Sequence, residues 1–206
     1  MTRQWLSFAA PDLFVLTTDE GEVLDELRTQ ASDRGLAVLG GAMIDDMLKA
    51  SLTWSWLSGE KDASIRAARK RLIGDGGSAL TFSTKIELAY VTGLVGSTVY
   101  SDLGRLRDIR NDFSHWVETK DNQRNVVGVT FELTDFKNRC AHFKLVDRFK
   151  VIYNGEYLAT DTARDRYLGT CMILYAALKL FVNFPTKENK VIDAVLKCSN
   201  SCDPAP

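Results

Sequence analysis

Residue types that mark a metal site, a disulfide framework or a strongly charged surface are scarce in this chain. Its 206 residues include only four cysteines, two histidines and four prolines. No two cysteines form a Cys-x-x-Cys pair, so the spacing is not that of a zinc site. The 26 lysines and arginines nearly balance 27 aspartates and glutamates, so no net field draws the protein to DNA or to an anionic membrane. We therefore expect no metal or other cofactor, and any nucleic-acid contact must come from a local basic patch.

Long uninterrupted apolar segments are also missing. The short apolar stretch at the N-terminus is broken by Pro11 and Asp12, which does not fit a signal peptide, so a cytoplasmic location is expected. Residues 167–184 form the most apolar segment, but Lys179 and Asn183 interrupt it and charged residues 164–166 open the same helix. This pattern predicts a central buried helix and no membrane contact.

What the chain does contain is the composition of an ordinary soluble globular protein. Hydrophobic residues make up 45% and charged residues 26%, and the length suits one domain with a sizeable core. Helical periodicity dominates along the sequence. We expect a mainly α fold: a single-domain helical bundle over residues 1–197, with a flexible C-terminal tail over residues 198–206 that carries reduced thiols.

Capping residues and apolar spacing predict where the helices begin and end. The longest early helix is predicted over residues 33–57, with Asp45 and Lys49 as an outward ion pair. Gly40-Gly41 falls inside this helix, which favours a close helix crossing or a kink. Further helices are expected to start at Asp62, at Thr81 or Ser83, at Ser97, and at Asp161 or Thr162, the last closed by Pro185.

Two segments predict a small β element. Val127, Val129, Phe131 and Leu133 alternate with other residues, as in a half-buried strand. Farther on, Asn154-Gly155 stands between apolar and aromatic residues, which is the strongest short hairpin signal in the chain. We therefore expect a small β-hairpin beside the helices.

The segment 103–115 concentrates side chains that suit catalysis. On one helix, Arg107, Asn111 and His115 form a single row, and Arg110 lies about 140° round from His115. A histidine can move a proton near neutral pH while an arginine stabilises a charged phosphorane, so this set suits metal-free RNA cleavage. Asn111 would then orient the phosphate or the imidazole ring.

These residues also carry a resemblance. Residues 74–115, with TFSTKIELAYVTGLV followed by RLRDIRNDFSH, resemble the mannitol operon repressor family, an all-helical group of bacterial proteins described as transcriptional regulators. The element RNDFSH is similar to the Arg-x4-6-His motif of the HEPN superfamily, with Arg110 and His115 at the motif positions and Asn111 beside the arginine. In ribonucleases of that superfamily, these positions form an active site, usually across a dimer.

A structural interpretation explains the same residues. Glu87 lies on an apolar helix, so Arg110 or Arg107 would neutralise its carboxylate while Asn111 and His115 cap the helix end. The basic helix after Asp62 has two interpretations as well: a solvated face packed by its Ile65, Ala68 and Leu72 side, or a phosphate-binding stripe. The residues of that stripe are Arg66, Arg69, Lys70 and Arg71. Trp54, Trp56 and Trp116 fit either lids over the core or a partner surface.

The resemblance and the composition together imply a cytoplasmic, mannitol-repressor-like transcriptional regulator. We expect it to act mainly through contacts with a protein partner or a second copy of itself, and to contact nucleic acid only through the basic stripe. The alternative is a metal-independent endoribonuclease that uses Arg110, Asn111 and His115.

Overall fold

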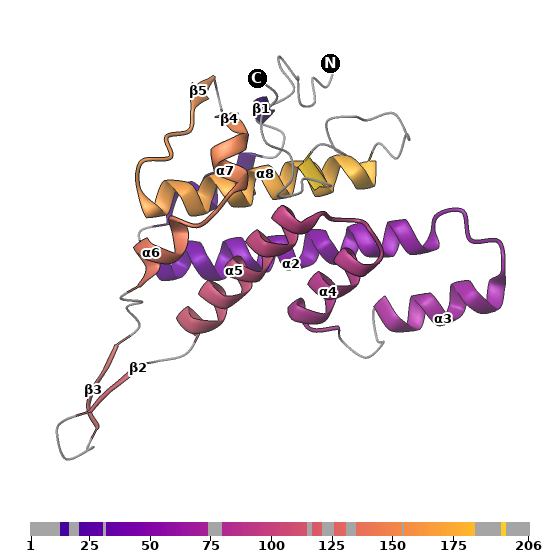
Figure 1. The fold of residues 1–206 in the computed structure, drawn as a ribbon, viewed down its shortest axis with the longest axis horizontal. Helices are drawn as coiled ribbons and strands as arrows, with labels where there is room; N and C mark the ends of the chain where they lie inside the picture. Colours follow the sequence, from indigo (N-terminus) through magenta and orange to yellow (C-terminus); the bar gives the residue numbers. More distant parts are fainter. Residues whose placement is uncertain are drawn as a thin grey trace.

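The computed structural model consists mainly of helices, with two small β-sheets beside them (Figure 1). It describes residues 13–16, 21–30, 32–73, 80–114, 117–120, 126–130, 135–153, 155–183 and 195–196. Eight helices lie within these residues: α1 (Gly21–Thr29), α2 (Asp33–Leu57), α3 (Ala63–Ile73), α4 (Phe82–Val91), α5 (Ser97–Ser114), α6 (Phe136–Cys140), α7 (Leu145–Arg148) and α8 (Ala163–Asn183). The predicted mainly α fold is confirmed, and the tail predicted from residue 198 lies outside the described residues.

Capping residues explain the starts of four helices, and three of them, Asp62, Thr81 and Thr162, are residues that the sequence predicts. The Ser32 hydroxyl accepts a hydrogen bond from the amide of Gly35 at the start of α2, and Thr81 accepts one from Thr84 at the start of α4. Asp62 accepts bonds from the amides of Ser64 and Ile65 at the start of α3. The hydroxyl of Thr162 accepts a bond from the amide of Asp165 in α8. Each cap satisfies a backbone N–H group that has no partner within its own helix.

Helix α2 is the centre of the fold, since it packs against α8, α5, α4 and α3 (Figure 1). The Gly40-Gly41 pair allows two of these contacts to be close. A Cβ atom at Gly40 would lie 3.0 Å from both Cys171 and Tyr167 of α8, and one at Gly41 would lie 2.9 Å from Cβ of Arg110 in α5. The predicted close crossing is therefore confirmed, on both sides of α2.

Helix α8 supplies much of the core. Every residue from 167 to 178 is buried, including Cys171, so the predicted central buried helix is confirmed. Burial raises the pKa of the Cys171 thiol and raises that of Cys140 in α6 to about 12, which keeps both thiols protonated near neutral pH. Among the described residues, no helix combines the length and apolar character that crossing a bilayer requires.

The strands form two sheets. In the first, β4 (Lys150–Tyr153) pairs antiparallel with β5 (Glu156–Tyr157) around Gly155, whose φ of 83° suits glycine, so the predicted hairpin is confirmed. Strand β1 (Leu13–Leu16), which the sequence did not predict, pairs parallel with β4. The second sheet pairs β2 (Val117–Lys120) with β3 (Val126–Thr130). Strand β3 contains Val127 and Val129 of the predicted alternating run, whereas Phe131 and Leu133 lie outside the described residues.

Candidate functional site

Helix α5 contains Arg107, Arg110 and Asn111 of the predicted catalytic cluster, and the burial of one row of its apolar residues decides where these side chains point. Leu103, Leu106 and Ile109 are fully buried and Phe113 almost so, which fixes the rotation of the helix about its axis. Neighbouring residues therefore point toward different parts of the molecule. Arg110 and Asn111 follow each other in sequence, so their side chains leave α5 about 100° apart.

The Arg110 side chain lies between α5, α2 and α4. Its guanidinium is 3.6 Å from Oδ2 of Asp45 and lies over the ring of Phe82 at 5.8 Å. The other carboxylate oxygen of Asp45 pairs with the ammonium group of Lys85, a buried residue of α4. Two cations from two helices thus neutralise one carboxylate at the junction. The prediction that Asp45 points outward toward Lys49 was wrong, because α4 and α5 cover that face of α2.

The prediction that Arg110 or Arg107 neutralises Glu87 was also wrong. Glu87 is exposed on α4 and accepts a hydrogen bond of 2.8 Å from the hydroxyl of Tyr100. Arg107 donates to the hydroxyl of Ser83 at 2.8 Å and pairs with Asp108. An arginine of this helix does neutralise a partly buried carboxylate, but the carboxylate belongs to α2, which no periodicity within α4 could indicate.

Asn111 is exposed on another side of α5, in a polar groove of about 540 Å³. The residues lining the groove come from α5, α6 and the turn after α6: Arg105, Asp108, Asn111, Asp112, Arg139 and His142. Arg110 is not among them, so the described structure does not bring Arg110 and Asn111 into one pocket. His115 lies outside the described residues.

The charges in the α5–α6 groove are already paired. Arg139 pairs with Asp112 at 2.5 Å and with Asp135 at 2.7 Å, and hydrogen bonding to Asp135 raises its pKa. Arg105 contacts Asp102 at 3.1 Å. A phosphate group would have to compete with these carboxylates for both guanidinium groups, so the groove is poorly suited to a polyanion.

The exposed His142 is the side chain in this groove that sequence reasoning did not connect with Asn111. In the sequence, His142 follows Cys140 by two residues, and nothing in that spacing indicates that it lies beside Asn111. Cys140 is fully buried whereas His142 is exposed, so the two side chains have different surroundings. Across the described residues, no group of three or more histidines, cysteines, aspartates or glutamates could hold a metal ion. Cys198 and Cys202 lie outside those residues.

A second groove, of about 750 Å³, lies between α2 and α3. Its lining combines three cations and one carboxylate with apolar and small polar residues: Asp46, Lys49, Ala50, Thr53, Trp54, Leu57, Ser58, Arg66 and Lys70. Trp54 also contacts Phe181 of α8, edge to face at 5.0 Å. Trp116, the third predicted aromatic, lies outside the described residues.

The four cations of the predicted basic stripe do not share one role. Arg66 and Lys70 line the α2–α3 groove, and Arg71 is exposed outside it. Arg69 turns back toward α2, where it donates to the carbonyl of Trp56 at 2.7 Å and pairs with Glu60 at 3.0 Å. The stripe therefore presents three exposed cations, while the fourth holds α3 to α2.

The predicted packing of α3 was wrong. Ile65 is 43% exposed and Leu72 is 50% exposed, whereas Ile73 is the one residue of α3 that is buried. Among the described elements, α2 is the main neighbour of α3, and it leaves Ile65 and Leu72 exposed. This helix consequently presents both cations and apolar side chains to solvent.

Comparison with known proteins gives no family to which the chain can be assigned. No family model, no curated protein and no solved structure matches it.

Proposed function

We propose that the chain is a regulatory interaction module, similar to the mannitol operon repressor proteins, that binds an acidic amphipathic helix of a protein partner between α2 and α3. The observation that carries this proposal is the lining of the α2–α3 groove. Arg66 and Lys70 stand on α3, facing the apolar side chains of Trp54 and Leu57 on α2. A helix with leucines on one face and glutamates beside them matches both kinds of surface.

Two exposed apolar side chains of α3, Ile65 and Leu72, add apolar surface next to the groove. A nucleic acid fits less well, because Arg69, the fourth cation of the stripe, is engaged by Glu60. Phosphate binding relies on many cations with few carboxylates near them.

Fluorescence anisotropy with a defined peptide tests this proposal. The probe is a labelled peptide of about five helical turns, with leucine and glutamate at amphipathic spacing. We expect wild-type protein to bind it with an affinity that falls as salt rises, and Lys70→Glu to bind about fivefold more weakly. Arg71→Glu is the matched control, since it makes the same charge change on α3 outside the groove and should leave binding nearly unchanged.

Three outcomes would overturn the proposal. The first is an equal loss in both variants, which would indicate attraction by overall charge. The second is no binding by the wild-type protein at peptide concentrations near a millimolar. The third is stronger binding of a DNA duplex than of the peptide at physiological salt, since that result would make the basic stripe a nucleic-acid surface.

A metal-independent endoribonuclease is the second candidate function. One observation favours it: the exposed His142 shares the α5–α6 groove with Asn111, although a phosphate would have to displace the carboxylates that pair with Arg139 there. If the chain cleaves RNA in this way, cleavage proceeds with a chelator present and His115→Ala abolishes it without lowering the melting temperature. Lys137→Ala, which changes an exposed residue of α6 outside the groove, then serves as the control and should leave cleavage unchanged. Intact RNA at high protein concentration would exclude the nuclease.

A further inference from the structure

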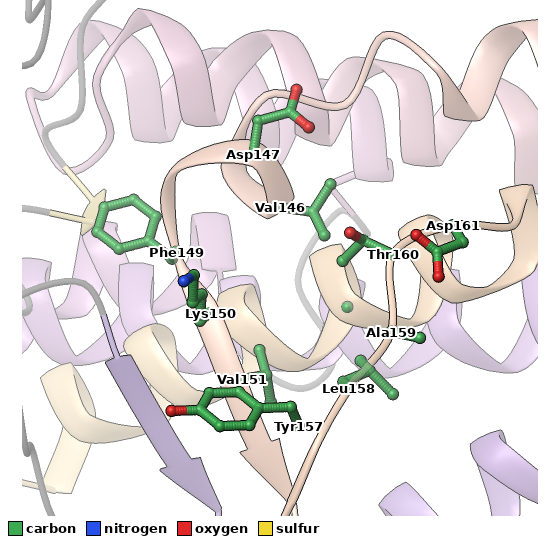
Figure 2. A pocket seen from close by; sticks show the side chains of 11 residues that line it. Val146, Asp147, Phe149, Lys150, Val151, Tyr157, Leu158, Ala159, Thr160 and Asp161 are labelled. Atoms are coloured by element: carbon green, nitrogen blue, oxygen red, sulfur yellow. The ribbon is translucent and has the colours of Figure 1, made fainter.

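A third cavity lies on the side of the molecule formed by the β4–β5 hairpin. Its volume is about 520 Å³, within the range of small-molecule pockets in proteins. Helix α7, strand β4, the segment after β5 and helix α8 surround it, as Figure 2 shows. Apolar side chains form most of the lining: Val146, Phe149, Val151, Tyr157, Leu158 and Ala159.

Backbone and packing contacts hold the walls of this cavity in place. The amide of Leu158 donates a 2.9 Å hydrogen bond to the carbonyl of Val151, which ties the segment after β5 to β4. A Cβ atom at Gly169 of α8 would lie 3.0 Å from Val146, so this glycine allows α7 to lie close to α8. The cavity is therefore preformed, and a ligand would not need to order its walls.

The polar residues of the cavity carry charges of both signs. Asp147 is paired with Arg166 at 2.8 Å, and Arg166 in turn donates to the carbonyls of Cys140 and Phe143. Lys150 and Asp161 differ from Asp147, because no described residue forms an ion pair with either one. Figure 2 shows Lys150 and Asp161 on opposite sides of the cavity, with Val146, Val151 and Leu158 between them.

From this arrangement we infer that the cavity binds a small zwitterion with an apolar body, such as a dipeptide of apolar residues. The ammonium group of the ligand pairs with Asp161, its carboxylate pairs with Lys150, and its side chains lie on Val146, Val151 and Leu158. Tyr157, which is 67% exposed at the rim, covers part of the bound ligand. This site is separate from the α2–α3 groove and does not depend on the function proposed for it.

Calorimetry on the full chain tests the inference with leucyl-leucine as the probe. We expect leucyl-leucine to bind, and its N-acetyl and C-terminal amide derivatives to bind about tenfold more weakly, because each lacks one charged group. Free leucine, which fills less of the cavity, should bind more weakly than the dipeptide.

Two variants assign each charge to its partner. Asp161→Asn should bind leucyl-leucine about tenfold more weakly and should no longer discriminate against the N-acetyl derivative. Lys150→Gln should lose discrimination against the amide in the same way. Asp46→Asn and Lys137→Gln, which change exposed residues outside this cavity, are the matched controls and should bind like wild type.

The inference fails if wild-type protein does not bind the dipeptide, or if both capped derivatives bind as well as the free dipeptide. It also fails if Asp161→Asn and Lys150→Gln keep wild-type selectivity. Both residues lie at the surface of the fold, and equal melting temperatures of the variants and wild type would show that weaker binding does not come from unfolding.

Discussion

The two ends of helix α2 differ in what covers them. From Asp33 to Leu52 the helix lies against α8 and α5, and the residues that face these helices are buried: Leu36, Ala37, Gly40, Gly41, Ile44, Leu48, Ser51 and Leu52. From Thr53 to Leu57 every residue is partly exposed, and α3 is the neighbour that forms the groove there.

This difference arises from the neighbours of α2 more than from its own composition. Leucine occurs at both ends of the helix, and tryptophan, the largest apolar side chain, occurs twice at the exposed end. Two glycines let α8 and α5 approach the first part closely, whereas a few polar bonds from Arg69 hold α3 to the last part. One helix therefore forms core over most of its length and a partly exposed surface, the proposed binding site, at its last turn.

Filling the close crossing should have the largest effect on stability. A Cβ atom added at Gly40 would already lie 3.0 Å from Tyr167 and Cys171, so the larger side chain of Gly40→Leu would force α2 and α8 apart. We expect the free energy of unfolding, measured with urea, to fall by about 3 kcal/mol. Gly104→Ala in α5 is the control, because nothing lies within 4 Å of its Cβ position. That variant should gain about 0.5 kcal/mol, and an equal loss in both variants would contradict the role of the crossing.

Removing the carboxylate at the junction of α2, α4 and α5 should have the next largest effect. Asp45→Ala leaves the buried Lys85 and the half-buried Arg110 without their shared partner, which should cost roughly 2 kcal/mol in urea unfolding. Asp46→Ala, on the exposed side of the same helix, should change stability by less than about 0.5 kcal/mol. Adding Lys85→Met to Asp45→Ala should recover much of the loss, and no recovery would mean that the buried ammonium group is not its cause.

Changing the pH should perturb the packed region through Asp102. This residue of α5 is fully buried and accepts hydrogen bonds from the amides of Lys144 and Leu145. Burial raises the pKa of Asp102 above its ordinary value of 3.8, although these amides and Arg105 act in the opposite direction. Because the pKa is higher in the folded state, the contribution of Asp102 to stability is complete below that ordinary value and is lost as the pH rises through the folded pKa.

Comparison with Asp102→Asn isolates this pH dependence. The advantage of wild type over the variant in unfolding free energy should shrink as the pH is raised from about 4 to 7, because asparagine does not titrate there. Urea unfolding of both proteins at several pH values measures this difference in unfolding free energy. An advantage that grows with pH would show that the amide hydrogen bonds outweigh the cost of burying the carboxylate.

The elements of the packed region were accessible to sequence reasoning because their signals are local. The bounds of α2 at Asp33 and Leu57 follow from apolar spacing, and Gly40-Gly41 predicts its close crossing. The parallel pairing of β1 with β4 joins segments far apart in the chain, so no local pattern indicates it.

The sequence could not predict which residues surround the candidate sites, because those neighbours come from segments far apart in the chain. Helical periodicity assigns Arg110 and Asn111 to different directions, but it does not say that Asp45 lies in one direction and His142 in the other. Periodicity likewise predicts an apolar side of α3 at Ile65 and Leu72, yet it cannot tell whether another element covers them. A pattern defines a face of a helix, and only the tertiary structure defines its neighbour.

Weakening the attachment of α3 should have the smallest effect on global stability and the most local one. Arg69→Gln removes the hydrogen bond to the carbonyl of Trp56 and the ion pair with Glu60. Both are partly exposed to solvent, so the free energy of unfolding should fall by only about 0.5 to 1 kcal/mol. Amide hydrogen exchange should nevertheless quicken throughout α3 and stay unchanged in α8, because α3 can open without unfolding the core. Arg66→Gln, which changes the same residue type on α3 without touching these bonds, should leave exchange as in wild type. Faster exchange in α8 as well would mean that both ends of α2 unfold as one unit, and the distinction between core and binding surface would not hold.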